Sequence, residues 1–136
     1  YFGEKDFQQL AIIRDLVRQK SLDILITGCP IVRESYGLAM SSRNERLKLQ
    51  EREAASVIYD ALQTAAKKAA VKKSLNEITQ EAVKEINALE NTVVFYFEFV
   101  NARSLEPIET LTTTENARII TAVDFKGVRL LDNIGL

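Results

Sequence analysis

Two serines and an arginine stand side by side in a short run that begins at a glycine, residues 37–44 (GLAMSSRN). Ser41 and Ser42 each carry a hydroxyl that can donate a hydrogen bond, and the planar guanidinium of Arg43 matches phosphate oxygens. Backbone N–H groups in a turn can converge on the same anion. Gly37 lets the chain bend where a side chain would obstruct it. These residue types at this spacing favour a loop that binds a polyphosphate.

A second cation, Lys5, stands at the start of an expected helix. Apolar residues recur at helical intervals from Asp6 to about Lys20 and predict that helix, with Asp6 placed to cap its first turn. A helix N-terminus presents unpaired N–H donors and positive potential, so a lysine there adds to an anion site. The same dipole disfavours a cation that serves only the helix. A plain surface lysine remains the alternative for Lys5, and capping alone could explain Asp6.

The run over residues 23–28 is short, apolar and rich in β-branched side chains. It predicts a buried strand of a parallel sheet. With the helix before it and a strand that ends near Gly3, it would form one crossover unit. Ligands of open α/β sheets collect at the carboxyl ends of the strands. The segments that follow Gly3 and Gly28 are therefore expected to lie close together.

Residues 45–90 are rich in helix formers and predict two amphipathic helices. One would follow an apolar stripe from Leu49 to Ala65, and the other would run from about residue 75 to residue 89. Ser74 with a glutamate three residues later fits the capping-box pattern of an N-terminus. Four lysines are expected to form a solvated connector between the helices: Lys67, Lys68, Lys72 and Lys73.

The last third of the chain alternates apolar runs with turn signals, which predicts strands. Three strands are expected, over residues 93–100, 118–125 and 128–132. The short Lys126-Gly127 connection predicts that the last two pair antiparallel, whereas residues 103–116 are expected to form a surface loop. Helices on this small sheet would make an α+β domain over residues 45–136, hinged near Asn44 to Leu47.

Composition indicates an ordinary cytoplasmic domain with one modest core. The chain has 136 residues, 46% of them hydrophobic and 27% charged, and a formal net charge of −1. A near-neutral balance lacks the basic field that nucleic-acid binding exploits. The single cysteine excludes a disulfide within the chain, and no apolar run approaches the roughly 20 residues that span a bilayer. We therefore expect neither a nucleic acid nor a membrane as partner.

Four runs of sequence, in one order and at one spacing, resemble the pantothenate synthetase family, the AMP-forming pantoate–β-alanine ligases. They are FGEKDFQQL from Phe2, PIVRE from Pro30, GLAMSSRN from Gly37 and RLLDN from Arg129. The resemblance extends over residues 1–136 and is to the family's C-terminal half. It implies that residues 1–44 are the end of a Rossmann-like nucleotidyltransferase domain that binds ATP and pantoate. Residues 45–136 would then be the α+β lid domain that closes over the nucleotide.

The resemblance also implies an activity and roles for individual residues. The family joins pantoate to β-alanine through a pantoyl adenylate, uses ATP and Mg²⁺, and releases AMP and pyrophosphate. The equivalent of Gln9 contacts pantoate, the backbone of Val32 meets adenine, and the run from Met40 to Arg43 is a KMSKS-like ATP signature. The implied nucleotide contacts are Gly3, Glu4, Lys5, Asp6, Val32, Met40, Ser41, Ser42 and Arg43. Of these, Lys5, Ser41, Ser42 and Arg43 would neutralise charge that grows on the phosphates. No metal ligands are implied.

The family's N-terminal half carries a histidine motif that also contacts ATP, whereas this sequence contains no histidine. We therefore expect a fragment or the ordered remainder of a longer protein, inactive alone, whose homodimer contacts lie largely in the other half. One alternative is a non-catalytic nucleotide-binding or assembly module that uses the same loop. Another is a different adenylate-forming nucleotidyltransferase, although the near-neutral charge argues against an RNA partner. For Arg33 and Glu34 the simplest expectation is pairing with neighbouring residues.

Overall fold

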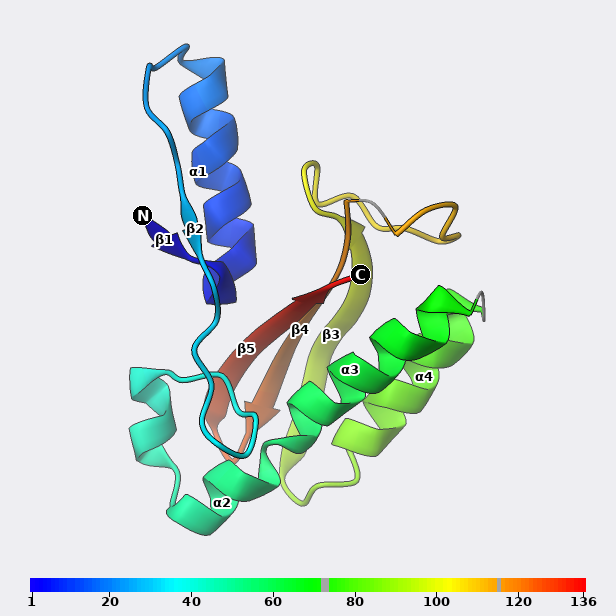
Figure 1. Ribbon diagram of the computed structural model, residues 1–136. Coiled ribbons are helices and arrows are strands. Elements are labelled where there is room, and N and C mark those ends of the chain that lie inside the picture. The colour runs from blue at the N-terminus through cyan, green and yellow to red at the C-terminus, as the bar shows by residue number, and fades with distance from the viewer. Residues whose placement is uncertain (72–73, 115) are drawn as a thin grey trace.

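The computed structural model describes residues 1–71, 74–114 and 116–136. The larger of its two sheets is three-stranded and antiparallel, in the order β3-β4-β5, and is formed by β3 (Thr92–Asn101), β4 (Ala117–Phe125) and β5 (Val128–Gly135) (Figure 1). The three predicted strands are confirmed. Lys126 and Gly127 both have positive φ, 52° and 77°, as a tight two-residue hairpin turn requires.

The described residues between 45 and 90 form three helices, rather than the two that were predicted. They are α2 (Leu49–Ala54), α3 (Val57–Ala70) and α4 (Leu75–Ile86). The first predicted helix is interrupted at Ala55, which is fully buried, and Leu49 is 64% exposed and so lies off the apolar stripe. Helix propensity is high on both sides of the break, so burial of Ala55 in the core, and not propensity, decides where the chain turns. None of the helices in the described residues is long and apolar enough to cross a membrane.

Two predictions concern the segment before α4: an N-cap at Ser74 and a connector of solvated lysines. The hydroxyl oxygen of Ser74 accepts a hydrogen bond from the backbone N–H of Glu77 at 3.4 Å, which confirms the predicted N-cap. Lys68 pairs with Glu81 at 2.5 Å and is not simply solvated. Lys72 and Lys73 lie outside the described residues.

Alternation along the strands gives the sheet two apolar faces. On β4, Ile119 and Val123 face the main core, which α3 and α4 cover (Figure 1). Ile120, between them, faces the other way and packs with Phe7 and Val100. The start of α1 (Phe7–Gln19) therefore lies against the face of the sheet opposite to α3 and α4.

Residues 1–29, called the arm below, contact the sheet around the 3₁₀ turn η1 (Glu4–Asp6) and Phe7, and the rest of α1 extends away from it (Figure 1). The arm contains β1 (Phe2–Gly3), η1, α1 and β2 (Gly28–Cys29), and its two strands pair in parallel. The predicted helix is confirmed. The predicted strand over residues 23–28 is wrong, because only Gly28 and Cys29 pair and the three large aliphatic side chains Leu22, Ile24 and Leu25 are exposed. Apolar composition alone cannot hold a strand whose backbone has no neighbour to pair with.

Candidate functional site

The first candidate segment is the turn that carries Lys5. Parallel pairing sets Gly3 beside Cys29, so the segments after both strands lie at the same end, as predicted. Lys5 is half-buried in η1. Asp6 occupies the N-cap position of α1, but its side chain accepts no capping hydrogen bond, so the capping role predicted for it is wrong. The exposed Asp6 carboxylate is therefore not engaged as a helix cap.

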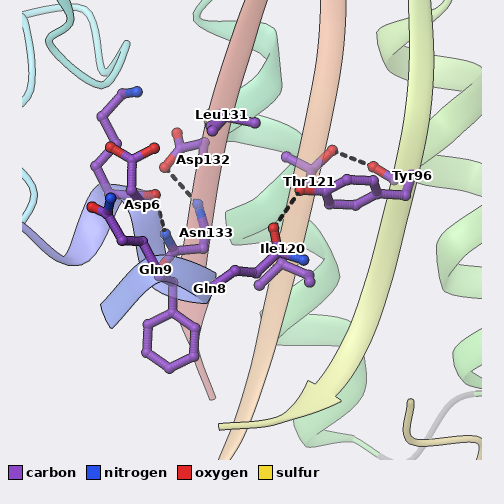
Figure 2. A pocket seen from close by; sticks show the side chains of 11 residues that line it. Asp6, Gln8, Gln9, Tyr96, Ile120, Thr121, Leu131, Asp132 and Asn133 are labelled. Carbon is purple, nitrogen blue, oxygen red and sulfur yellow. Dashed lines mark hydrogen bonds between the residues drawn. The ribbon is translucent and has the colours of Figure 1, made fainter. Parts of the chain in front are cut away.

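A cavity of ≈190 Å³ lies between this turn and the sheet, and is called the α1–sheet pocket below. Figure 2 shows Asp6 and Gln9 on one side of it and Tyr96 and Thr121 on the other. The Tyr96 hydroxyl donates a hydrogen bond to Oε1 of Gln8 at 3.1 Å. Burial raises the pKa of Tyr96, so its phenol stays protonated and able to donate near neutral pH. Lys5 also lines the pocket, which thus combines a cation, two carboxylates and amide groups.

The second candidate segment is a small hairpin over residues 32–40. Arg33 and Ala39 form an antiparallel bridge, and the backbone N–H of Met40 donates to the carbonyl of Val32 at 2.9 Å. Gly37 at its tip has φ +103°, and a Cβ atom there would lie 3.0 Å from Cδ1 of Tyr59. The prediction that a side chain at this position would obstruct the chain is confirmed.

The phosphate-type donors follow the hairpin in the 3₁₀ turn η2 (Ser42–Arg46). Ser41 is its N-cap, and the Ser41 oxygen accepts a hydrogen bond from the backbone N–H of Arg43 at 3.3 Å. That bond leaves the hydroxyl hydrogen of Ser41 to donate elsewhere. The side chains of Ser42 and Arg43 are exposed, and no ion pair to Arg43 forms among the described residues. This turn therefore offers two hydroxyls and a guanidinium to solvent.

Other residues near the turn divide into exposed and buried positions. Met40 is 48% exposed and Val32 is 67% exposed, so neither side chain is buried by packing. Asn44, which sequence reasoning did not single out as a site residue, is 2% exposed. Its side-chain amide donates to the carbonyl of Ala39 at 3.0 Å. Asn44 thereby holds the turn from its buried side, while the side chains of Ser42 and Arg43 stay exposed and that of Ser41 half-exposed.

Arg33 links the hairpin to the sheet. Its guanidinium forms a two-pronged ion pair with Asp132 of β5, at 2.7 and 2.8 Å, and donates to the carbonyl of Gly37 at 3.0 Å. The same group stacks over the Tyr59 ring, 3.6 Å from its centroid. The expectation that Arg33 pairs with neighbours holds only for its bond to Gly37, since its carboxylate partner is 99 residues away. A planar guanidinium and a carboxylate form a strong, geometrically specific pair. The local sequence around Arg33 does not reveal this partner.

Asn133 links the Lys5 turn to the same strand. Its side-chain amide donates to the backbone carbonyls of Glu4 and Lys5, at 2.9 and 3.0 Å. Its oxygen accepts a hydrogen bond from the guanidinium of Arg118, which also stacks on the Phe7 ring at 4.1 Å. Burial lowers the pKa of Arg118, and the nearby Glu4 carboxylate opposes that shift. Sequence reasoning missed this network because its members are remote along the chain.

The structure therefore brings both candidate segments against one strand, β5, with the Lys5 turn and η2 each in contact with it. No hydrogen bond or ion pair joins the two segments directly in the described part of the chain. Within the same part, no group of three or more His, Cys, Asp and Glu residues could hold a metal ion. A ligand that contacted both segments would therefore lie across the gap between them, beside β5.

A parallel strand pair with a crossover helix, followed by helices on an antiparallel sheet, makes this a mixed α/β protein with a small α+β portion. The family model described as pantoate–β-alanine ligase matches residues 1–135, and the chain belongs to that family.

Relatives and solved structures agree with the family. The pantothenate synthetase of Flavobacterium psychrophilum is 44% identical over 139 residues, which cover 100% of this chain and 48% of the relative. The crystal structure of pantothenate synthetase from Thermus thermophilus has a TM-score of 0.90 and 36% identity, and the match covers 99% of this chain and 48% of that one.

The crystal structure of the Francisella tularensis pantoate–β-alanine ligase, complexed with β,γ ATP and β-alanine, has a TM-score of 0.61 and 28% identity. The match covers 98% of this chain and 42% of that one. The chain thus spans about half the length of the relatives it matches. The mixed fold with a small α+β part that was expected from sequence is confirmed by these neighbours.

Proposed function

We propose that this chain supplies part of an ATP-dependent ligase site that joins pantoate to β-alanine, the step that forms pantothenate for coenzyme A biosynthesis. The observation that carries the proposal is the convergence of two donor-bearing segments on β5. One is the Lys5 turn, which Asn133 of β5 holds by a hydrogen bond to the Glu4 carbonyl. The other is the Ser41–Arg43 turn, whose preceding hairpin is joined to β5 by the ion pair of Arg33 with Asp132. Family membership and the ATP-bound Francisella neighbour support the nucleotide as ligand.

The proposed residue roles follow the chemistry of each group. Lys5, Ser41, Ser42 and Arg43 would stabilise charge on the phosphates, because each places a donor or a cation on the surface of its turn. The backbone of Gly3 and Val32 and the side chains of Glu4, Asp6 and Met40 would complete the nucleotide contacts. Gln9, which lines the α1–sheet pocket, would bind pantoate through its amide.

Magnesium would accompany the nucleotide. Mg²⁺ in nucleotide sites is commonly held by substrate phosphates with few protein ligands. The described residues hold no cluster of carboxylates that could serve as a separate metal cage, so this arrangement is the one that the residues fit. Mg²⁺ would supply further charge neutralisation at the phosphates.

The proposed reaction proceeds in two steps. A pantoate carboxylate oxygen attacks the α-phosphorus of ATP and pyrophosphate leaves with the electron pair of the broken P–O bond. The amine of β-alanine then attacks the acyl carbon, AMP leaves, and the amine loses a proton. The adenylate is needed because oxide is a hopeless leaving group at neutral pH, whereas AMP is a good one. Such a route depends on positioning and charge stabilisation, which these turns offer, and needs no protein nucleophile.

The full ligase is proposed to need more than these residues. We propose that residues 1–44 and 45–136 act as the end of a nucleotide-binding domain and a lid, and that the 136 residues alone do not turn over. We further propose a cytoplasmic homodimer whose contacts lie largely outside this chain. Each of these rests on the family, whose members are about twice as long.

The test is to join this chain to the N-terminal portion of the Flavobacterium psychrophilum relative that it does not match. AMP release that requires both pantoate and β-alanine, and that Arg43→Ala lowers by roughly a hundredfold, is the expected result. Another carboxylic acid or amine that supports faster AMP release would overturn the substrate assignment. The 136 residues alone should release no AMP, and release by them would contradict the proposed division of the site.

A further inference from the structure

Asp132 and Asn133 are consecutive polar residues in β5, 5% and 2% exposed. Consecutive side chains of a strand point to opposite faces of the sheet. Here both faces are covered, because Leu130 and Ile134 pack into the core under α3 and α4 while Asn133 meets the turn that leads into α1. Two adjacent residues can therefore reach two segments that lie on opposite sides of one sheet.

Asp132 reaches the segment on the α3 side. Both of its carboxylate oxygens receive hydrogen bonds from Arg33, and Arg33 also holds the carbonyl of Gly37 at the hairpin tip. The Arg33 guanidinium is also packed against the ring of Tyr59 of α3, which helps to orient it. The hairpin that leads into Ser41 is thereby fixed to β5 at its tip.

Asn133 reaches the segment on the other side. Both of its long-range bonds from the amide end at backbone carbonyls of η1, those of Glu4 and Lys5. Arg118 donates to the Asn133 oxygen and so determines which way the amide points. These hydrogen bonds are made to backbone carbonyls, so they do not depend on the side chains of Glu4 and Lys5. Asn133 therefore fixes the backbone of the Lys5 turn, and this contact does not use the lysine amine.

We propose that Asp132 and Asn133 are positioning residues that act as a two-sided clamp: they set the distance and orientation between the Lys5 turn and the Ser41–Arg43 turn. The nucleotide part of this inference rests on the proposed function. Buried polar groups cost stability unless they are paired, so apolar residues would serve a purely structural strand better. The clamp gives a reason for two such groups at adjacent positions, because ligand phosphates that bridge the turns require a fixed spacing.

Three variants of the 136-residue chain separate the two sides. Asn133→Asp keeps the shape and the acceptor for Arg118 but replaces the amide donor with an oxygen that repels the Glu4 and Lys5 carbonyls. Asp132→Asn keeps the shape but removes the charge and one acceptor for Arg33. Asp124→Asn is the matched control, because Asp124 lies in the same sheet and accepts a bond from the backbone of Gly127 at 2.9 Å.

Amide hydrogen exchange followed by mass spectrometry reads each side without a ligand. Asn133→Asp should raise exchange in residues 1–9 about tenfold and leave residues 33–44 unchanged, and Asp132→Asn should do the reverse. The control should change neither segment. Exchange that rises equally in both segments with either variant, or in neither, would overturn the clamp.

Calorimetric titration with Mg-ATP measures the affinity of each variant, and a double-mutant cycle tests whether the clamp acts through Lys5 and Arg43. Asn133→Asp should weaken binding roughly tenfold in the parent chain and less than about twofold in a Lys5→Ala background, because the clamp acts through Lys5. Asp132→Asn should show the same dependence on Arg43→Ala. Equal losses in both backgrounds would overturn the positioning role. A parent chain that does not bind Mg-ATP would refute its nucleotide site, whereas the exchange result would still decide the clamp.

Discussion

The arm and the α+β portion of this molecule have similarly apolar sequences but bury them to very different extents. In the α+β portion, most large aliphatic residues of α3, α4 and β4 are almost fully buried, as Leu62 at 0% and Ile119 at 0% illustrate. In the arm, Ile12 is 61% exposed and Leu25 is 89% exposed. The pattern of apolar residues along a sequence thus indicates which residues favour burial. Whether they are buried depends on whether another helix or strand packs against them.

The two regions also differ in how their strands are completed. The three strands of the α+β sheet pair along most of their length, whereas β1 and β2 pair over two residues only. The turns with the phosphate-type donors lie where the two regions meet, at β5. The candidate site is therefore supported mainly from the well-packed region, and the arm contributes Lys5 through one small area of contact.

The largest expected difference between the regions is in their contribution to stability. Leu62→Ala should lower the free energy of unfolding by about 2–5 kcal/mol, because it opens a cavity in a close-packed core. Leu25→Ala should change it by less than about 0.5 kcal/mol, since the side chain is 89% exposed. Urea unfolding of both variants measures this. Similar losses in the two would mean that the arm is packed as tightly as the core.

The next effect concerns the hairpin, which we assign to the well-packed region. Gly37→Ala should destabilise the chain by roughly 1–3 kcal/mol, because φ is +103° and the new Cβ would meet the Tyr59 ring at 3.0 Å. Gly3→Ala is the matched control, since a Cβ there has nothing within 4 Å. Thermal unfolding of both variants decides the point. A loss of stability in Gly37→Ala as small as that in Gly3→Ala would show that the hairpin is not closely packed against Tyr59.

The smallest effect is a pH dependence at the edge of the α+β portion. A hydrogen bond from Lys126, at 2.9 Å, holds the pKa of Glu51 below its usual value. A carboxyl whose pKa is lower in the folded state stabilises above its unfolded pKa and loses that contribution as the pH falls through its folded pKa.

Stability of the parent chain should therefore decline more steeply than that of Glu51→Gln from about pH 6 to about pH 3. Both partners are partly exposed, so added salt should reduce the difference. Glu85→Gln, on the exposed side of α4, serves as the control and should follow the parent chain. Parallel pH curves for the parent chain and Glu51→Gln would contradict the role of this pair.

Local signals predicted much of the fold. The sheet was predictable because alternation and a Lys-Gly turn are read within a few neighbouring residues, and the same holds for the Ser74 cap. The strand at residues 23–28 was mispredicted because β-branched composition reports a preference and not the presence of a partner strand. The break at Ala55 was missed because tertiary packing decides it.

The candidate site divides in the same way. The residues with phosphate-type donors were predictable from their types and spacing, and family resemblance added their roles. Their supports were not predictable, because Arg33 meets Asp132 across 99 positions and Asn133 meets Glu4 across 129. A single sequence carries no local signature of such pairs, and even Asn44, inside the run, has the polar character of a surface residue while the structure buries it.

The most direct measurement is a calorimetric titration of this chain with Mg-ATP, repeated on Arg43→Ala and on Arg46→Ala. Arg46 lies in the same turn but binds the carbonyl of Gly127, at 3.3 Å, so its replacement controls for a general loss of positive charge. We expect saturable binding by the parent chain and by Arg46→Ala, and a loss of at least roughly tenfold for Arg43→Ala. Equal binding by all three proteins, or none by any of them, would contradict a phosphate site at Ser41–Arg43.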